Sequence, residues 1–328
     1  NGTVYAWGWG QYGQLGNGYT TNRNDTDYYS SEKIYSAPVQ VLNGEQTSET
    51  GYLKEVVQID AMGGTGHSER NRFGTSLAVT ESKEVYGWGN SWYGALGVNS
   101  SIVSKPVRVG TDISNAVQVA GGGKSGSDDY HVYSIGNTGY TYILKEDGTV
   151  SSLGYNVNGE LGNGSKTSTI NVCTVQGLTN VAQIAGSKNG NFGAAVKKDG
   201  TIWTWGQNTY GQLGNGSSVN SMLPVQVKSA DGNSFLADIV QISAGYVHSM
   251  ALKKDGTVLA WGRNDGGQLG NNKTSNKSLP VQVKGGASGS EYLTDVVQVT
   301  AGNWHSMALK ANGTVYAWGW GQYGQLGN

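Results

Sequence analysis

The sequence predicts an all-β fold, a β-propeller of four-stranded antiparallel blades, and three observations support this prediction. First, the phrase NGTVYAWGWGQYGQLGN occurs at 1–17 and, letter for letter, at 312–328, with weaker copies between. Second, the spacing of these copies is typical of propeller blades. Third, glycine is abundant, with 53 residues at recurring slots, which indicates turns rather than linkers. The glycine after the tryptophan slot marks each copy: Gly8, Gly89, Gly154, Gly206, Gly262 and Gly319.

The clearest repeat runs over 238–283 and contains four expected strands. The apolar run 239–243 is typical of a buried strand, and 248–252 follows it as a second strand. An Asp-Gly hairpin signal then leads to a third strand at 258–261. The fourth strand, 280–283, begins with a proline, which suits an edge position. This order of strands is that of a propeller blade.

Three other repeats contain the same four strands in the same order. Their expected ranges are 56–59, 76–79, 85–88 and 106–109; 116–119, 140–144, 150–153 and 172–175; and 181–184, 192–196, 202–205 and 224–227.

Two partial repeats flank these units and complement one another. The first supplies a third strand from Val4 to Trp7 and a fourth at 38–41, and the last supplies 296–299, 306–309 and a third strand from Val315 to Trp318. Pairing both sets within one blade gives five closed blades without edge strands. One third strand is then left over, so we expect it to be displaced, to join a neighbouring molecule, or to belong to a larger ring. Residues 1–328 are therefore a single propeller or a segment of a longer repeat array.

Composition excludes several classes of function. Charged residues make up 14% of the chain and the net charge is −1, which argues against a nucleic-acid or anionic-membrane surface. Cys173 is the one cysteine, so neither an internal disulfide nor a cysteine metal site is expected. No apolar run is long enough for membrane insertion. The Ser, Thr, Asn and Gly content favours an extracellular or cell-surface protein, with the cytoplasm as the alternative.

Four motifs recur in a fixed order: VVQVxAG, HSMALK, DGTVxAWG and GQLG. In this order they resemble the repeats of the regulator of chromosome condensation (RCC1) family, and the resemblance covers essentially the whole chain. It implies a β-propeller, normally of seven blades. The best-known member is a guanine-nucleotide exchange factor that docks on chromatin, but this chain has no basic tail and no assignable exchange segment. The uniform Gly- and Asn-rich repeats look more like those of bacterial or phage surface members.

Motifs that suggest chemistry have structural explanations here. His248 and His305 share one slot, which Phe192 and Thr75 fill in other repeats, so we expect structural, hydrogen-bonded histidines rather than ligands. The stretch from Gly121 to Gly126 lacks the spacing of a phosphate-binding loop and is expected to be an enlarged loop. No catalytic set recurs at usable spacing, so we expect no enzyme activity, cofactor or metal.

Two insertions, from Gly18 to Ser36 and from Gly121 to Gly139, interrupt the repeat pattern. The first insertion lacks the glycine and the final glutamate of a calcium loop. Because loops on a rigid scaffold carry specificity and tyrosines make good contact surface, we predict that the insertions contact a partner. The candidate residues are Tyr19, Asp25, Asp27, Tyr28, Tyr29, Tyr35, Asp128, Asp129, Tyr130 and His131.

Other recurring residues divide into packing slots and loop slots. The tryptophans at one recurring position of the third strand are expected to pack between blades: Trp7, Trp88, Trp205, Trp261 and Trp318. The leucines at one recurring position of the following loop are expected to be buried: Leu15, Leu96, Leu161, Leu213, Leu269 and Leu326. The loop after the third strand is rich in aromatic residues that either bind glycans or proteins or pack within the loop: Trp9, Tyr12, Trp92, Tyr93, Tyr155, Tyr210, Trp320 and Tyr323.

Three functions follow from these features. The first is a non-enzymatic structural or interaction module that binds a protein or glycan through the loops between strands. The second is a self-assembling ring or filament subunit, joined head to tail through the duplicated strand, as in donor-strand pairing. The third, which rests on the family resemblance alone, is nucleotide exchange on a small GTPase.

Overall fold

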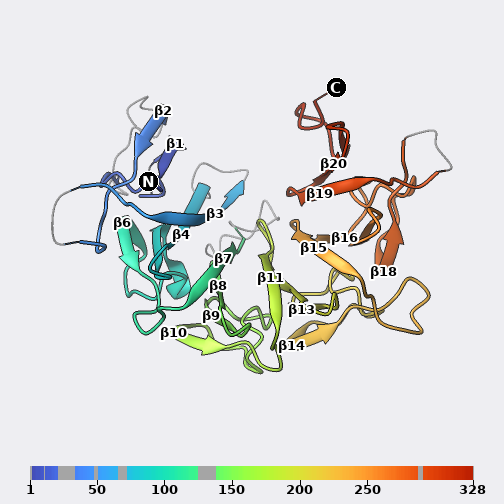
Figure 1. Ribbon diagram of the computed structural model, residues 1–328, viewed down its shortest axis with the longest axis horizontal. Coiled ribbons are helices and arrows are strands. Elements are labelled where there is room, and N and C mark those ends of the chain that lie inside the picture. The colour runs from blue at the N-terminus through green and yellow to red at the C-terminus, as the bar shows by residue number, and fades with distance from the viewer. Residues whose placement is uncertain are drawn as a thin grey trace, which may run out of the picture. The chain divides into compact units, whose positions relative to one another are not determined.

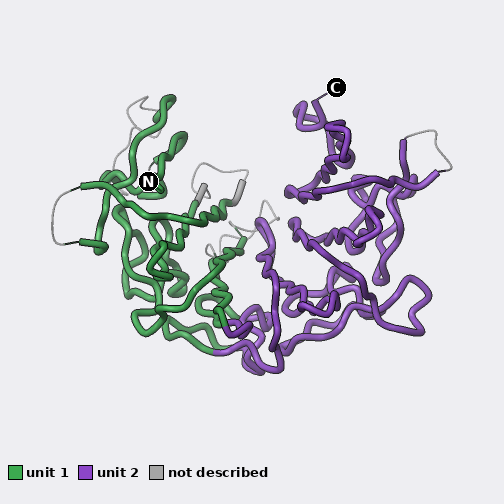
Figure 2. Tube along the Cα trace, viewed as in Figure 1, with its two compact units in different colours: residues 1–146, 151–156, 167–173 green, residues 147–150, 157–166, 174–328 purple. Residues whose placement is uncertain are grey.

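The computed structural model describes residues 2–10, 12–20, 34–47, 51–65, 72–124, 138–286 and 291–327. These residues form antiparallel sheets, with one short 3-10 turn, η3, at Trp92–Gly94. The all-β prediction is confirmed. The chain divides into two compact units, which Figure 2 colours separately: residues 1–146, 151–156 and 167–173, and residues 147–150, 157–166 and 174–328.

Unit 1 contains a two-stranded sheet and nearly all of two four-stranded sheets. The strands are β1 (Tyr5–Trp9) and β2 (Ile34–Gln40); β3 (Val56–Thr65), β4 (Arg72–Thr80), β5 (Val85–Asn90) and β6 (Ile102–Arg108); and β7 (Ala116–Gly122), β8 (Tyr140–Lys145), β9 (Val150–Gly154) and β10 (Thr169–Thr174). Within each sheet the strands follow chain order, which is the order of a propeller blade.

Unit 2 contains two four-stranded sheets and one three-stranded sheet. Its strands are β11 (Val181–Gly186), β12 (Phe192–Lys197), β13 (Ile202–Gly206) and β14 (Ser221–Gln226); β15 (Ile239–Ala244), β16 (His248–Lys253), β17 (Val258–Gly262) and β18 (Lys277–Gln282); and β19 (Val296–Ala301), β20 (His305–Lys310) and β21 (Val315–Gly319). Figure 1 shows the first strands β11, β15 and β19 following one another across this unit.

The outer strands begin earlier than the sequence predicted. In the sheet of β15–β18, the fourth strand begins at Lys277, before Pro280, and Lys277 pairs with Gly262. The register shifts between Ala260 and Gly262, and Gly262 has a φ of 104°, which only glycine adopts readily. The bulge extends the pairing beyond the proline, so the prediction that this strand starts at 280 was wrong.

Two further boundaries differ from the prediction. The strand expected at 56–59 continues as β3 to Thr65, paired with β4. Gly121 and Gly122, expected in an enlarged loop, lie at the end of β7, where they pair with Thr141 and Tyr140. Glycine is a weak strand former, so the sequence pattern ended these strands too early.

Tryptophan links each sheet to the preceding copy of the repeated phrase. The indole Nε1 donates to a backbone carbonyl in four sheets, at 2.8 to 3.0 Å: Trp88 to Gln14, Trp205 to Glu160, Trp261 to Gln212 and Trp318 to Gln268. The first three indoles are at most 2% exposed, which confirms their packing between blades. Trp7 is 64% exposed, so the prediction that it packs between blades was wrong.

The leucine slot behaves in the same way. Five of its members are at most 3% exposed, as predicted: Leu15, Leu96, Leu161, Leu213 and Leu269. Leu326 is only half-buried, because no later sheet in the described residues packs over it.

Candidate functional site

Two of the predicted partner-contact residues, Tyr19 and Tyr35, belong to the described part of the chain. Tyr19 is exposed and Tyr35 is half-buried beside Gly10. The remaining candidates lie outside the described residues: Asp25, Asp27, Tyr28, Tyr29, Asp128, Asp129, Tyr130 and His131. Their roles stay predictions.

In unit 1, the loops that follow the third strands bring two aromatic rings together. The rings of Tyr93 and Tyr155 meet edge to face with centroids 5.0 Å apart. Tyr155 is buried and Tyr93 is exposed, so one ring anchors the other at the surface. Aromatic loop residues therefore combine packing with an exposed face, two roles that the sequence left open.

A larger cluster lies on the same kind of loop in unit 2 and centres on Arg263. Strand β17 ends at Gly262, and the Arg263 backbone N–H donates to the Val247 carbonyl oxygen at 2.9 Å, which holds the loop against the start of β16. The guanidinium carbon then lies 4.8 Å from the ring centroid of Tyr210 and 4.5 Å from that of Trp304. The Arg263 guanidinium thus contacts one ring from each of the two sheets on either side of its own sheet.

Further contacts fix the position of these groups. Asp265 accepts from Arg263 Nε at 2.9 Å, and Tyr246 packs edge to face on Trp304 with centroids 5.2 Å apart. Tyr246 is buried, whereas Tyr210 and Trp304 are half-buried and Asp265 is exposed. We call Tyr210, Tyr246, Arg263, Asp265 and Trp304 the Arg263 cluster.

The electrostatics of the cluster keep its cation charged. Burial acts to lower the pKa of Arg263, but the hydrogen bond that it donates to Asp265 and the charge interactions with Asp265, Tyr210 and Tyr246 outweigh burial, so the pKa is raised. A guanidinium between aromatic faces is stabilised by the quadrupoles of the rings and needs little ordering on binding. Tyr, Trp and Arg are the residues that most often dominate the binding energy of protein interfaces. The arrangement suits recognition of a partner rather than bond chemistry.

The sequence pointed to Tyr210 but not to Arg263 or Trp304. A signal was present, because Arg263 takes the loop slot that Trp9, Tyr155 and Trp320 fill in other copies of the phrase. A charged residue in an aromatic slot, bordered by aromatic loops, is typical of a cation–π contact.

His248 has the structural role that the sequence predicted. Its Nε2 lies 3.0 Å from the Ser306 hydroxyl, which itself donates to the Gln268 carbonyl oxygen, so Nε2 is the donor. Burial, with a smaller contribution from His305, lowers the pKa of His248 to about 3. The ring is therefore neutral, and it lies over Gly245, where a Cβ would come within 2.3 Å of it.

Glu160 is a buried acid that the sequence analysis did not single out. It occupies the slot of Gln14, Gln212 and Gln268, and its carboxylate accepts from the Asn158 backbone N–H and side-chain amide, each at 2.8 Å. Burial raises its pKa to about 7, although the bonds from Asn158 act in the opposite direction. Its place in the repeat and its burial indicate a packing role.

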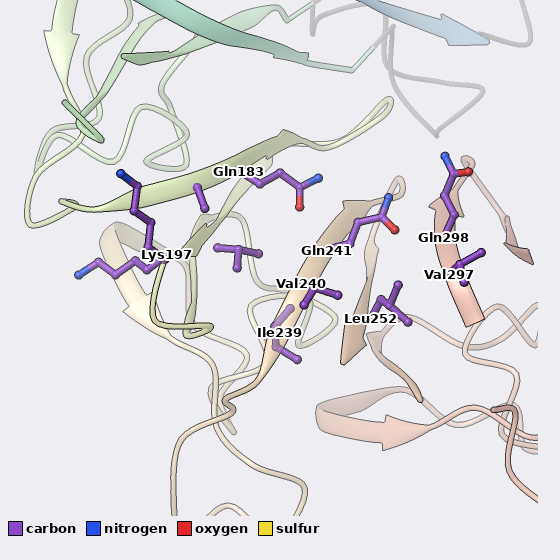
Figure 3. A pocket seen from close by; sticks show the side chains of 11 residues that line it. Gln183, Lys197, Ile239, Val240, Gln241, Leu252, Val297 and Gln298 are labelled. Carbon is purple, nitrogen blue, oxygen red and sulfur yellow. The ribbon is translucent and has the colours of Figure 1, made fainter. Parts of the chain in front are cut away.

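An open groove of about 610 Å³ lies along the first strands of unit 2 (Figure 3). Two of its glutamines, Gln183 and Gln241, hydrogen-bond to the backbone of the next sheet and so clamp the two sheets together. Gln241 accepts from the Val299 backbone N–H at 2.9 Å and donates to the Val299 carbonyl oxygen at 3.1 Å, and Gln183 holds Ile242 in the same way. Gln298, the next in the series, is exposed and has no hydrogen-bond partner among the described residues.

The described part of the chain contains neither a cluster of metal-ligating side chains nor a membrane-spanning helix. No group of three or more His, Cys, Asp or Glu side chains there is placed to hold a metal ion. Within the same residues, no helix has the length and apolar character needed to cross a membrane.

Comparison with known proteins decides the family. The model of the regulator of chromosome condensation (RCC1) repeat matches residues 1–68, 83–126, 199–252 and 255–309, and a second model of this repeat matches 181–212, 239–268 and 296–325. The chain belongs to the RCC1 repeat family.

Relatives in this family include much longer proteins. The ultraviolet-B receptor UVR8 of Arabidopsis thaliana is 30% identical over 331 residues, which cover 99% of this chain and 62% of UVR8. The human E3 ubiquitin-protein ligase HERC2 is 27% identical over 334 residues, which cover all of this chain and 6% of HERC2. The chain thus spans less than two thirds of either relative. A bacterial or phage origin stays a prediction.

Solved structures of the family share the fold. Prp20p from Saccharomyces cerevisiae, described with its binding to Gsp1p and histones, superposes with a TM-score of 0.72 at 25% identity, over 99% of this chain and 69% of Prp20p. Yeast RCC1 (Prp20) bound to Kap60 gives a TM-score of 0.70 at 24% identity, over 99% of this chain and 67% of that chain. The propeller blades predicted from the repeats are those of an RCC1-type β-propeller.

Proposed function

We propose that the chain is a non-enzymatic interaction module that binds a partner protein through the Arg263 cluster and the loops beside it. The observation that carries this proposal is the guanidinium of Arg263, held between the rings of Tyr210 and Trp304 at the ends of neighbouring sheets. Such a pre-ordered surface loses little side-chain entropy on binding. The two RCC1-family structures described with partner proteins make a protein the favoured class of partner.

A glycan is the other partner class that aromatic loops support, since sugars stack on exposed rings. A secreted or cell-surface location, which the charge-poor composition favours, would suit either class. A glycan array probed with the wild-type chain and with Trp304→Ala separates the two partner classes. If the wild-type chain binds one class of glycan and Trp304→Ala does not, the partner is a glycan rather than a protein.

Photo-crosslinking tests the binding surface directly. A photoreactive amino acid at Thr209, an exposed neighbour of Tyr210, should capture a discrete partner from extract of the organism that encodes the chain. The same group at Lys254, in an exposed β16–β17 hairpin, is the matched control. Capture at Thr209 that is lost in Arg263→Ala supports the proposal. Equal capture at both positions, or capture that survives Arg263→Ala, contradicts it.

Guanine-nucleotide exchange is the alternative that the family supports, because Prp20p is described with its binding to Gsp1p. The chain covers 69% of Prp20p, so the activity of the whole protein does not transfer on similarity alone. Release of labelled GDP from a panel of small GTPases tests it. Accelerated release from one of them would show exchange activity and replace the non-enzymatic assignment.

A further inference from the structure

One nitrogen of the Arg263 guanidinium is not used by the chain itself. The central carbon of the group lies over the rings of Tyr210 and Trp304, 4.8 and 4.5 Å from their centroids. Nε and Nη2 donate hydrogen bonds to Asp265. Nη1 donates to no group in the described part of the chain, and it reaches the solvent, with the side chain 22% exposed. Both N–H groups of Nη1 are therefore free to bind a partner.

The acceptor that best matches Nη1 is a carboxylate. A guanidinium only donates hydrogen bonds and stays charged, and hydrogen bonds to charged groups are roughly twice as strong as those between neutral groups. The rings and Asp265 hold the guanidinium in position before a partner arrives, so little side-chain entropy is lost when Nη1 binds. A neutral acceptor, such as a backbone carbonyl of the partner, would gain less from the same donor.

The charges around Arg263 also favour an acidic partner. In each antiparallel sheet of unit 2, the loops after the first and third strands lie at the same end of the sheet, which we call the loop end. Contacts join the loop ends of successive sheets, as Arg263 does with Tyr210 and Trp304. The acidic residues there are Asp265, which is paired with Arg263, and Glu160, which is buried. The basic residues of the loop end are Lys166, Lys188, Arg263, Lys273 and Lys277.

The opposite end of the same sheets has no such excess of positive charge. The turns after the second and fourth strands carry as many acidic as basic residues: Lys197, Lys198, Lys228, Lys253, Lys254, Lys284 and Lys310; Asp147, Asp199, Asp231, Asp238, Asp255, Glu291 and Asp295. The excess at the loop end is local, because the net charge of the whole chain is −1. A local excess of this kind attracts a negatively charged partner and orients it during its approach.

We propose that the partner of the Arg263 cluster presents an aspartate or glutamate whose carboxylate accepts a hydrogen bond from Arg263 Nη1. This inference rests on the proposed function, because it assigns a chemistry to the partner of the same site. Asp265 keeps its hydrogen bonds to Nε and Nη2, and apolar atoms of the partner pack on the half-buried rings of Tyr210 and Trp304. The packed rings exclude water from the new hydrogen bond and so strengthen it.

Selection from a library of random peptides displayed on phage tests the inference without a known partner. Peptides that bind Trp304→Ala are removed first, and the wild-type chain then captures those that need the cluster. The captured peptides should share an aspartate or glutamate. Replacing this acid by its amide should weaken binding to the wild-type chain by at least about tenfold, the loss expected for a hydrogen bond between charged groups. Because the protein is unchanged in this comparison, a folding defect cannot produce the loss.

A double-mutant cycle shows whether the acid acts through Arg263. The acid and amide forms of a captured peptide should bind Arg263→Gln with nearly equal affinity, because Nη1 is absent from this variant. Lys254→Gln removes an exposed charge from the opposite end of the sheets and is the matched control. This control should retain the difference of about tenfold between the two forms of the peptide.

The outcomes separate this inference from the proposed function. Captured peptides that need Trp304 but share no acid would overturn the acidic partner and leave the binding surface in place. An acid that contributes equally to binding of the wild-type chain and of Arg263→Gln would have the same meaning. A selection that yields no peptide dependent on Trp304 would contradict both the acidic partner and the proposed function.

Discussion

Replacing Glu160 by glutamine should change how the stability of the chain depends on pH. The carboxyl is fully buried, and burial raises its pKa from an ordinary 4.5 to about 7. The folded state therefore holds this proton more tightly than the unfolded chain does. The resulting contribution to stability is complete below about pH 4.5 and is lost as the pH rises towards 7. Glutamine, which other copies of the phrase have in this slot, has no such proton to lose.

The two pKa values set the size of the effect. Each unit of difference is worth about 1.4 kcal/mol, so the contribution of the Glu160 proton to the free energy of unfolding should be about 1 kcal/mol below its low-pH value at pH 5 and about 3 kcal/mol below it at pH 8. Glu160→Gln loses the acceptor for the Asn158 amide, which shifts stability by a constant amount. The difference between variant and wild type should therefore grow by about 2 kcal/mol from pH 5 to pH 8.

Urea unfolding followed by tryptophan fluorescence, repeated from pH 5 to pH 8, measures this difference. Gln212→Glu is the matched control, because it places the same acid in the equivalent slot of the next sheet and should make stability fall more steeply with pH. A constant difference between Glu160→Gln and wild type across the range would refute the raised pKa. It would show that Glu160 is as solvated as an ordinary surface carboxylate.

Three further substitutions, two of them with a matched control, test the packing between sheets. His248→Phe introduces the aromatic residue that the preceding sheet has at this position. In the wild type, the free energy of unfolding should fall by about 2 kcal/mol from pH 7 to pH 5, because the histidine takes up a proton near pH 6.5 when the chain is unfolded but not when it is buried. The variant should not show this fall, and urea midpoints that decrease equally in both proteins would contradict the prediction. Gly214→Ala should lower the free energy of unfolding in urea by about 2–4 kcal/mol, because φ is +65° and a Cβ would lie 2.7 Å from the Trp261 indole nitrogen. Gly267→Ala, where a Cβ would meet nothing within 4 Å, should lower it by only about 1–2 kcal/mol. Equal losses in the two variants would show that the Cβ at 214 does not clash with Trp261. Trp261→Phe should lower the melting temperature, while the same change at exposed Trp7 should leave it nearly unchanged; equal shifts would place both indoles in similar surroundings.

Much of the fold could be predicted because each repeat carries the same physical pattern. Short apolar runs gave the first three strands of each blade to within a few residues, as for β15–β17. The fourth strand was harder to bound, because the bulge at Gly262 and the pairing of Lys277 depend on tertiary contacts rather than on hydrophobic periodicity. The burial of Trp7 and Leu326 was also mispredicted, because the exposure of a side chain depends on the residues that pack against it and not on its position in the repeat alone.

The candidate site was less accessible to sequence reasoning. Tyr210 was identified from its loop, but Arg263, which contacts it, lies 53 residues further along the chain, and Trp304, which contacts Arg263, lies 94 residues further along. Such contacts follow from the stacking of sheets, which brings loops of successive repeats together. The pKa of Glu160 is likewise set by burial that one sequence does not reveal.

Amide hydrogen exchange of the chain, measured alone and in complex with the partner that photo-crosslinking identifies, is the most direct measurement of the binding surface. If the partner binds the Arg263 cluster, amide protection should appear in residues 207–212, 246–248, 263–266 and 303–305. The hairpins at 197–200 and 253–256 should exchange at unchanged rates. Protection confined to those hairpins, with the loops around Arg263 unaffected, would show that the partner binds elsewhere.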